Sequence, residues 1–230
     1  MRKYLVALCF IAFGGTAAQA DRPFNWTGFY MGAHGGWAST DIESNVSGKP
    51  VQGLEGGIVG AQIGAQYQFQ GGLVTGVEAD ISFAKLTQTV RDGNYITQSG
   101  TISQLGSVRG RLGYAMGAWM PYLTGGFAWD RLEQTQQCPD PAAVPFGHCN
   151  VANGFAPYNL GKTITNTGWV YGLGIEHAIN KVWSFRLEGL RYEFGSETYA
   201  LGTTPSGKTL TPYALKHDVD VVRFATNMKF

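Results

Sequence analysis

Residues that could carry chemistry are few in this 230-residue chain. The histidines are His34, His148, His177 and His217. A hydrolase or acyltransferase needs a nucleophile such as serine, activated by a histidine and a carboxylate, yet no serine stands four residues before any of these histidines. The Gly-x-Gly pieces are not followed by a helical pattern, so they are not nucleotide motifs. We therefore expect no catalytic residues and no enzyme.

Histidine and tyrosine could also bind a prosthetic group, because both ligate haem iron. His148 and His217 fall in or near long polar segments, and Tyr158, Tyr199 and Tyr213 lie close to them in sequence. Most histidines in such segments are simply solvated. We therefore expect no cofactor, and keep His148 and His217 as the candidate ligands of an alternative haem-binding function.

Two of the three cysteines, Cys138 and Cys149, lie close together in one polar segment. In an oxidising compartment such a pair is expected to form a disulfide. A zinc site made with His148 is the alternative, but it lacks a fourth ligand. We expect the disulfide and no metal.

The N-terminal residues have the features of a secretory signal peptide. Arg2 and Lys3 precede a short apolar stretch, Leu5 to Phe13, and Ala18-Gln19-Ala20 has the small-x-small form of a cleavage site. The apolar stretch is too short to span a bilayer as a helix. We expect residues 1–20 to be a signal peptide and residues 21–230 to form one domain.

The remainder of the chain alternates apolar and polar residues with the period of a β-strand. The last such segment carries Phe230, Met228, Phe224 and Val222 on one face and ends on an aromatic residue. An exposed apolar face of this kind is typical of a strand that meets lipid. The eight alternating segments are Thr27–Trp37, Ile58–Phe69, Leu73–Leu86, Ile102–Ala115, Trp119–Leu132, Thr167–Ala178, Val182–Phe194 and Val219–Phe230.

The connections between these segments alternate in length. Residues 70–72, 116–118 and 179–181 form short turns, whereas 38–57, 87–101, 133–166 and 195–218 form long polar loops. An even number of strands with short turns at one end and long loops at the other predicts an all-β fold, an eight-stranded antiparallel transmembrane up-and-down β-barrel. The short turns and both termini should face the periplasm, and the long loops the exterior.

The two faces of the predicted strands differ in charge. The lumen of an eight-stranded barrel is just wide enough for side chains to fill, and buried charges need partners. We therefore expect a balanced ion network that plugs the lumen, with a narrow polar conduit as the alternative. The charged residues assigned to the inner face are Glu78, Asp80, Glu176, Glu188, Arg109, Arg111, Arg186 and Arg223.

The six tryptophans fall near the strand ends. Trp26, Trp119 and Trp183 are predicted at the short-turn end, and Trp37, Trp129 and Trp169 at the long-loop end. Ten residues of a strand tilted by roughly 40° climb about 25 Å, which is the height of the apolar band. The tryptophans therefore predict two aromatic girdles.

Several of these segments resemble the small eight-stranded outer-membrane proteins of alpha-proteobacteria, a family of surface antigens and porin-like barrels. The similarity covers all eight predicted strands and lapses in the long loops. The segments that carry it are Trp26–Gly32, Gly76–Asp80, Val108–Tyr114, Pro121–Gly126, Gly168–Glu176, Trp183–Gly195 and Val222–Phe230.

The resemblance implies an envelope protein of the Gram-negative outer membrane that supports envelope integrity and exposes antigenic loops. Some relatives are described as porins or haem binders, so a weak porin and a ligand receptor are the alternatives. Expected partners are outer-membrane lipid and lipopolysaccharide, the barrel assembly machinery acting on a C-terminal signal at Phe230, and an external ligand or host surface. Without Arg2 and Lys3 the chain has 15 basic and 16 acidic residues, so nothing indicates a nucleic-acid partner.

Overall fold

The computed structural model describes residues 24–44, 53–91, 97–138, 157–204, 207, 209–210 and 212–230. The predicted signal peptide, residues 1–20, lies outside them. The described residues contain no helix that is long and apolar enough to cross a membrane. The strands are β1 (Gly28–Ser44), β2 (Glu55–Gln68), β3 (Leu73–Arg91), β4 (Thr97–Tyr114), β5 (Trp119–Cys138), β6 (Tyr158–Ala178), β7 (Trp183–Phe194), β8 (Glu197–Tyr199) and β9 (Tyr213–Lys229).

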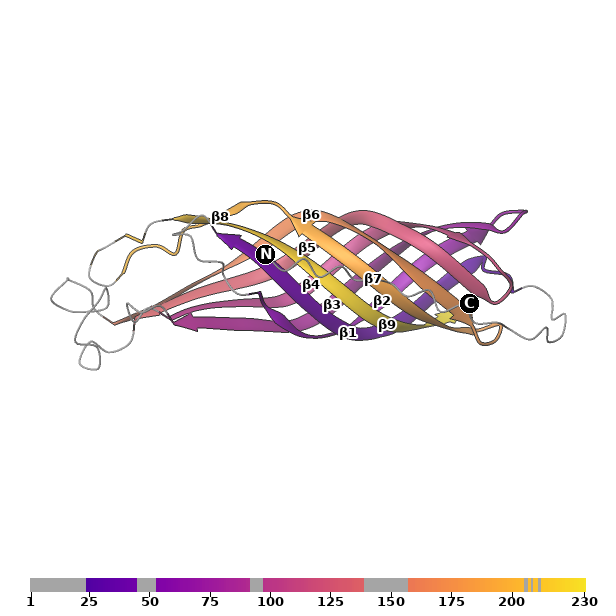
Figure 1. Ribbon diagram of the computed structural model, residues 1–230, viewed down its shortest axis with the longest axis horizontal. Helices are drawn as coiled ribbons and strands as arrows, with labels where there is room; N and C mark the ends of the chain where they lie inside the picture. Colours follow the sequence, from indigo (N-terminus) through magenta and orange to yellow (C-terminus); the bar gives the residue numbers. More distant parts are fainter. Residues whose placement is uncertain are drawn as a thin grey trace.

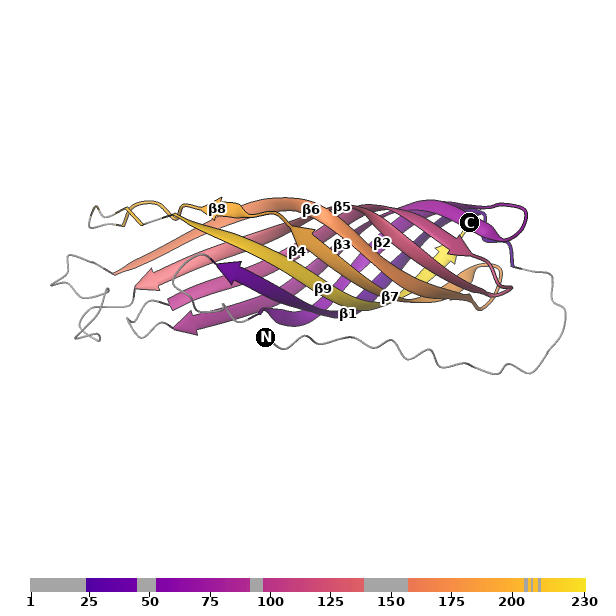
Figure 2. The ribbon, with the colours of Figure 1, turned by 45° about the horizontal axis from the view of Figure 1, so that its top comes forward.

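The strands form one closed antiparallel barrel (Figures 1 and 2). Neighbours in sequence pair with each other, and β9 closes the barrel by pairing with both β7 and β1. The three-residue β8 pairs only with the first residues of β9, so eight strands make the barrel wall. The predicted fold class is confirmed.

Tight turns join the strands at one end of the barrel, which we call the short-turn end. Gly71, Gly72 and Gly117 there have positive φ angles, a conformation that glycine adopts without steric cost. The C-terminus lies at the same end (Figure 1). The other end, the long-loop end, is where the strands run on past the predicted boundaries.

The predicted long loops were wrong in extent. β3 continues to Arg91, β5 and β6 remain paired as far as Cys138 and Tyr158, and β9 begins at Tyr213. In Figure 2, β3 to β6 extend beyond the shorter strands. The sequence hides these extensions because threonine, serine and glutamine occur there on both faces, which removes the apolar–polar alternation.

The outer surface of the barrel wall is apolar, as the alternation predicts. Phe29, Val77, Leu123 and Leu187 are each more than half exposed. Soluble monomers rarely expose a large contiguous apolar surface, whereas lipid covers such a surface in a membrane barrel.

Five of the six tryptophans lie on this outer surface. Trp37 and Trp169 are 58% and 68% exposed, and Trp119 and Trp183 are also exposed. Trp129 lies flat on the wall, because its partner across the strand pair, Gly106, has no side chain to displace the indole ring. Trp26 is only 1% exposed, which corrects its assignment to a girdle: it precedes β1 and turns into the barrel mouth.

The long-loop half of the lumen is mainly apolar, with buried polar residues such as Asp130 and His217 among the apolar ones, which the sequence analysis did not anticipate. Inward positions there alternate with outward ones just as they do elsewhere, so the pattern alone does not distinguish an inward leucine from an outward one. The largest members of this apolar layer are Leu54, Leu86, Ile102, Leu105, Leu132, Leu190, Tyr192, Phe194, Tyr199 and Leu215.

Candidate functional site: the ion network of the lumen

The eight charged residues predicted for the inner face all lie inside the barrel, each no more than 6% exposed. Strand register brings most of them together in opposite-charge pairs. Glu78 on β3 is directly across from Arg109 on β4, Glu176 on β6 from Arg186 on β7, and Glu188 on β7 from Arg223 on β9. Paired positions on neighbouring strands are close enough for such side chains to interact.

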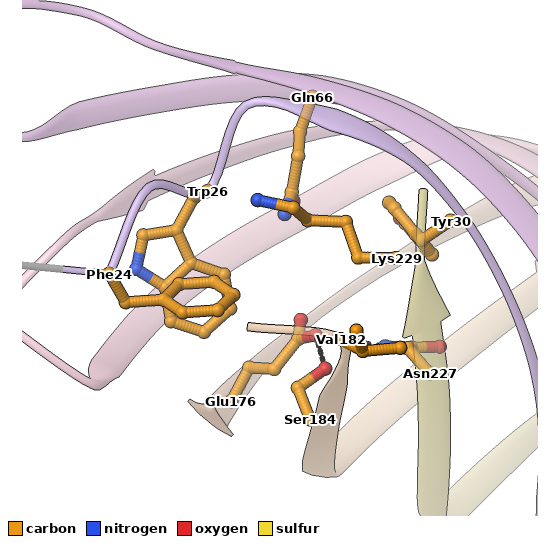
Figure 3. Close-up of a pocket in the computed structure, with 9 residues that line it drawn as sticks. All are labelled: Phe24, Trp26, Tyr30, Gln66, Glu176, Val182, Ser184, Asn227 and Lys229. Carbon is orange, nitrogen blue, oxygen red and sulfur yellow. Dashed lines mark hydrogen bonds between the residues drawn. The ribbon is translucent and has the colours of Figure 1, made fainter. Parts of the chain in front are cut away.

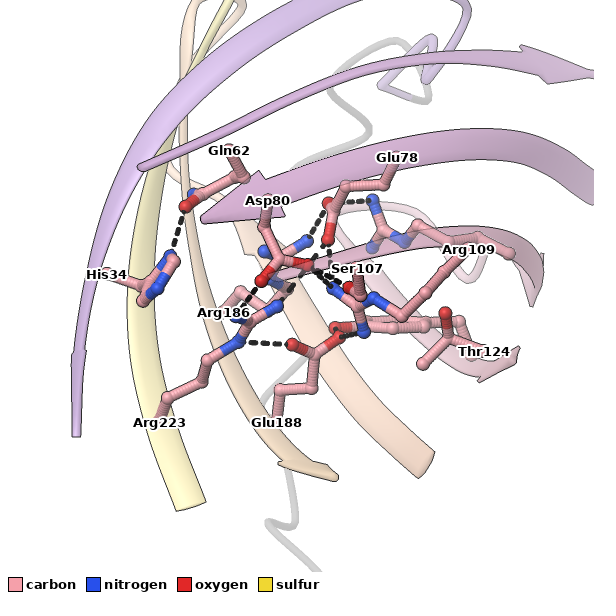
Figure 4. A network of polar contacts seen from close by, with 12 residues as sticks. His34, Gln62, Glu78, Asp80, Ser107, Arg109, Thr124, Arg186, Glu188 and Arg223 are labelled. Carbon is pink, nitrogen blue, oxygen red and sulfur yellow. Dashed lines mark hydrogen bonds and ion pairs between the residues drawn. The ribbon is translucent and has the colours of Figure 1, made fainter. Parts of the chain in front are cut away.

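Arg109 joins carboxylates on two sides of the lumen. It forms ion pairs with Glu78 and, at 3.2 Å, with Asp80, both on the adjacent strand β3. Its Nη1 also lies 3.0 Å from Glu188 Oε1 on β7, across the barrel (Figure 4). The side chains of Arg109, Glu78, Asp80 and Glu188 are completely inaccessible to solvent.

The other three arginines extend the same network. Arg223 binds Glu188 through Nε at 2.6 Å and Asp80 through Nη1 at 3.0 Å. Arg186 forms an ion pair with Glu78 through Nη1, and Arg111 Nη2 lies 2.7 Å from Glu176 Oε2. Four arginines thus face four carboxylates, which neutralises the buried charge as buried ion pairs require.

Two tyrosines that the sequence analysis did not select complete the network. The Tyr30 hydroxyl donates to Glu78 and accepts from Arg111, at 2.7 Å each. The Tyr122 hydroxyl donates to Glu188 at 2.8 Å, and the Arg111 guanidinium carbon lies 4.1 Å from the centre of the Tyr122 ring. Both rings lie over wall glycines, Gly64 and Gly174. A tyrosine at an inward position beside an inward glycine was the sequence signal available.

A belt of uncharged polar residues flanks the ion network. His34 Nδ1 lies 2.7 Å from Gln62 Oε1, and His34 Nε2 lies 2.8 Å from Ser82 Oγ. Gln62 also donates to Asn227 Oδ1 at 2.7 Å. His34 therefore has both ring nitrogens engaged by the wall of the barrel and acts as a packing residue.

His217 is not in an exposed loop, which corrects its predicted position. It lies on β9, is 2% exposed, and stacks on Phe194 with ring centres 4.9 Å apart. Its Nε2 is 2.6 Å from Asp130 Oδ2, and Asp130 Oδ1 accepts from Asn166 at 2.7 Å. This nitrogen is occupied within a buried polar cluster, so His217 is not an accessible haem ligand. His148 lies outside the described residues.

The short-turn end is closed by aromatic residues that precede β1. Trp26 packs with Val74, Met120, Tyr122 and Ala178, and Phe24 covers Trp26 edge-on with ring centres 4.6 Å apart. A hollow of about 230 Å³, counted with space open to solvent, remains beside them (Figure 3). Charged and polar groups, including Glu176, Ser184, Asn227 and Lys229, line it. Its Glu176 oxygens are engaged by Ser184, Asn227 and Arg111.

The sequence predicts a disulfide between Cys138 and Cys149 and no metal site. Within the described residues no group of three or more His, Cys, Asp or Glu side chains could hold a metal ion. Cys138 is disulfide-bonded. Cys149 lies outside the described residues, so the pairing of Cys138 with Cys149 stays a prediction.

The closed barrel has an apolar outer surface and a polar lumen, as outer-membrane barrels do. Residues 5–214 match the family of the outer membrane protein beta-barrel domain. The chain belongs to this family. It is therefore a β-barrel of the bacterial outer membrane, and the sequence resemblance to small outer-membrane proteins of alpha-proteobacteria is confirmed.

Named relatives of this outer-membrane barrel include a 31 kDa outer-membrane immunogenic protein of Brucella melitensis biotype 1. The two are 31% identical over 195 residues, which is 78% of this chain and 75% of the relative. A 22 kDa outer membrane protein of Rhizobium leguminosarum bv. viciae is 25% identical over 210 residues, covering 90% and 79% of the two chains. Among solved structures, OprG of Pseudomonas aeruginosa aligns with a TM-score of 0.46 and 13% identity, covering 90% of this chain and 99% of OprG.

Proposed function

We propose that this protein is a non-catalytic surface component of the outer membrane, with a plugged lumen, that contributes to envelope integrity. The observation that carries the proposal is the filling of the lumen in three layers. Trp26 closes the short-turn end, the ion network fills the middle, and the apolar layer around Leu105 and Phe194 fills the long-loop half. The interior of an eight-stranded barrel is just wide enough for side chains to fill, and these three layers occupy it.

In this proposal the short-turn end and both termini face the periplasm, and the long-loop end faces the exterior. The extended ends of β3 to β6 then stand above the membrane, where they and the loops they carry are accessible as surface antigens. Support comes from relatives named as outer-membrane immunogenic proteins. The partners would be outer-leaflet lipid including lipopolysaccharide, and the barrel assembly machinery during insertion.

Planar-bilayer recording of the purified protein tests the plugged lumen. Folding is first verified by resistance to SDS before heating. We expect no conductance steps, because the described side chains of the three layers fill the lumen. Regular steps that disappear in the Arg109→Ala and Arg111→Ala variants would contradict the proposal and favour a porin.

Cysteine labelling of intact cells tests the orientation. Thr163 at the long-loop end and Lys181 in a short turn are both exposed. With a membrane-impermeant maleimide, we expect Thr163→Cys to be labelled and Lys181→Cys to be protected until the cells are lysed. The reverse pattern would overturn the proposed orientation.

A further inference from the structure

The outer surface of β3 to β6 changes chemistry in steps along the barrel axis. In the membrane band these strands expose apolar residues such as Val77, Leu112 and Leu123. At the edge of the band stand the aromatic residues Phe83, Trp129 and Trp169. Two cations, Lys85 and Arg131, follow directly, and both are exposed.

The two cations lie at nearly the same height. Each follows an aromatic residue, Phe83 or Trp129, by two positions, so each lies about 5 Å further along the barrel axis at a strand tilt of roughly 40°. They are separated only by β4, whose Gln104 pairs with both Phe83 and Arg131. Two strand spacings and the two-residue offset from Phe83 to Lys85 together amount to roughly 12 Å between the backbones, a span that one large headgroup can bridge.

Neither cation forms an ion pair with another described residue. Among the ion pairs between described residues, Lys85 and Arg131 take part in none. The Ser103 hydroxyl donates to the backbone oxygen of Arg131 at 3.4 Å. This contact does not involve the Arg131 guanidinium. An exposed arginine and lysine at the membrane surface form a surface that attracts phosphate.

Beyond the cations, the outward positions of the four strands carry hydroxyl groups. Some of these hydroxyl groups contact each other across neighbouring strands: the Oγ1 atoms of Thr87 and Thr101 are 3.3 Å apart. Glu133 stands among them as a further hydrogen-bond acceptor. Rows of hydroxyl groups can form hydrogen bonds with the hydroxyl groups of a saccharide. The hydroxyl residues used here are Thr87, Thr101, Ser103, Thr135, Thr163 and Thr165.

The opposite side of the barrel has the reverse charge at this level. Asp41 on β1 pairs across the strands with Asp218 on β9, and Asp218 with Glu193 on β7. The one arginine described nearby, Arg191, is held by Asp218 and Asp220 at 2.9 Å each. On that side the carboxylates outnumber Arg191 and Lys216, whereas on the outward face of β3–β6 the cations Lys85 and Arg131 stand beside one described carboxylate, Glu133. A phosphorylated headgroup is therefore favoured at β3–β6 over β7, β9 and β1.

We propose that the outward face of β3 to β6 binds a phosphorylated glycolipid of the outer leaflet lengthwise. Acyl chains lie on the apolar band, a phosphate contacts Lys85 and Arg131, and sugars lie along the hydroxyl rows. The proposal deepens the lipid partnership of the proposed function and rests on its assignment of the long-loop end to the exterior.

Native mass spectrometry of the purified barrel tests this site with three probes: rough lipopolysaccharide, the same material after removal of its phosphates, and phosphatidylglycerol. We expect wild type to retain the phosphorylated lipopolysaccharide and Lys85→Ala/Arg131→Ala to bind it about tenfold or more weakly, as loss of charge-assisted contacts implies. Lys181→Ala/Lys216→Ala removes the same charge from exposed positions outside the sector and should bind as wild type does.

The sugar contacts have a separate test. Thr163→Val/Thr165→Val should weaken lipopolysaccharide retention several-fold and leave phosphatidylglycerol unchanged. Equal retention by wild type and Lys85→Ala/Arg131→Ala overturns the site. Equal retention of phosphatidylglycerol and lipopolysaccharide, with the same sensitivity to the cations, overturns the glycolipid assignment in favour of a general anionic-lipid surface. Purified barrels have no orientation and need no conductance, so these results are independent of the tests of the proposed function.

Discussion

Replacing Arg109 by alanine is the most direct test of the ion network. Among the described residues of β4, Arg109 is the one that forms ion pairs both with the β3 carboxylates and with Glu188 across the lumen. Its removal leaves four buried carboxylates facing three arginines. Breaking a buried ion pair by removing one partner costs about 3–5 kcal/mol, which corresponds to a factor of roughly 10² to 10³·⁵ in the unfolding equilibrium.

The assay is urea unfolding of the barrel in phosphatidylcholine vesicles, followed by tryptophan fluorescence. Arg131→Ala is the matched control, because Arg131 is exposed and forms no ion pair with a described residue. Surface substitutions of this kind change stability by about 0.5 kcal/mol or less. We expect the Arg109→Ala midpoint to fall well below both wild type and Arg131→Ala.

A double variant separates charge from packing. Arg109→Met/Glu188→Gln roughly keeps side-chain volume and restores charge balance. The carbonyl oxygen of the new glutamine can accept from Arg223 Nε, and its NH2 group then faces the Tyr122 hydroxyl, whose oxygen can accept. We expect it to lose less stability than the sum of the two single variants, because residues in one network couple. An Arg109→Ala midpoint equal to that of wild type, or a strictly additive double variant, would refute the network as a stabilising element.

Three further predictions concern the wall, the loops and the C-terminus. Gly174→Val should lower the free energy of unfolding by about 1–3 kcal/mol through overpacking, because the added side chain meets the Tyr122 ring. Gly189→Val is the control and should be nearly neutral in the same urea titration, because nothing lies within 4 Å of an added Cβ there. Equal effects of the two substitutions would contradict this packing. Because Cys138 is disulfide-bonded, it should react with a maleimide under denaturing conditions only after a reductant is added. Mass spectrometry of the proteolytic peptides should identify Cys149 as its partner. Labelling without a reductant would show a free thiol. The Phe230 amide donates to Phe29 O at 2.9 Å. Deleting Phe230 should reduce the folded, SDS-resistant fraction of the protein in the outer membrane, but should leave refolding of the purified chain largely intact. Unchanged assembly in cells would exclude Phe230 as an assembly signal.

The sequence by itself determined the fold class and the face on which the charged residues of the predicted strands lie. A period of two assigns each residue of a strand to one side of a sheet, so the charged residues from Glu78 to Arg223 could be placed together on the inside. The outward tryptophans followed in the same way. Balanced charges on the inner face were sufficient to predict an ion network without knowing which atoms meet.

Only the tertiary structure decided which charged residues form ion pairs with each other and how the two ends of the barrel are filled. Closure and stagger of the barrel bring Arg109 to Glu188, residues far apart in sequence, and no local pattern encodes that distance. Trp26 precedes the first strand, so alternation says nothing about its direction, and packing on Met120 turns it inward. Asp130 lies in a strand that the sequence predicted, but His217 meets it because β9 begins before the predicted segment Val219–Phe230. The period reports which face a residue occupies, whereas contacts across a closed lumen depend on the curvature that all strands produce together.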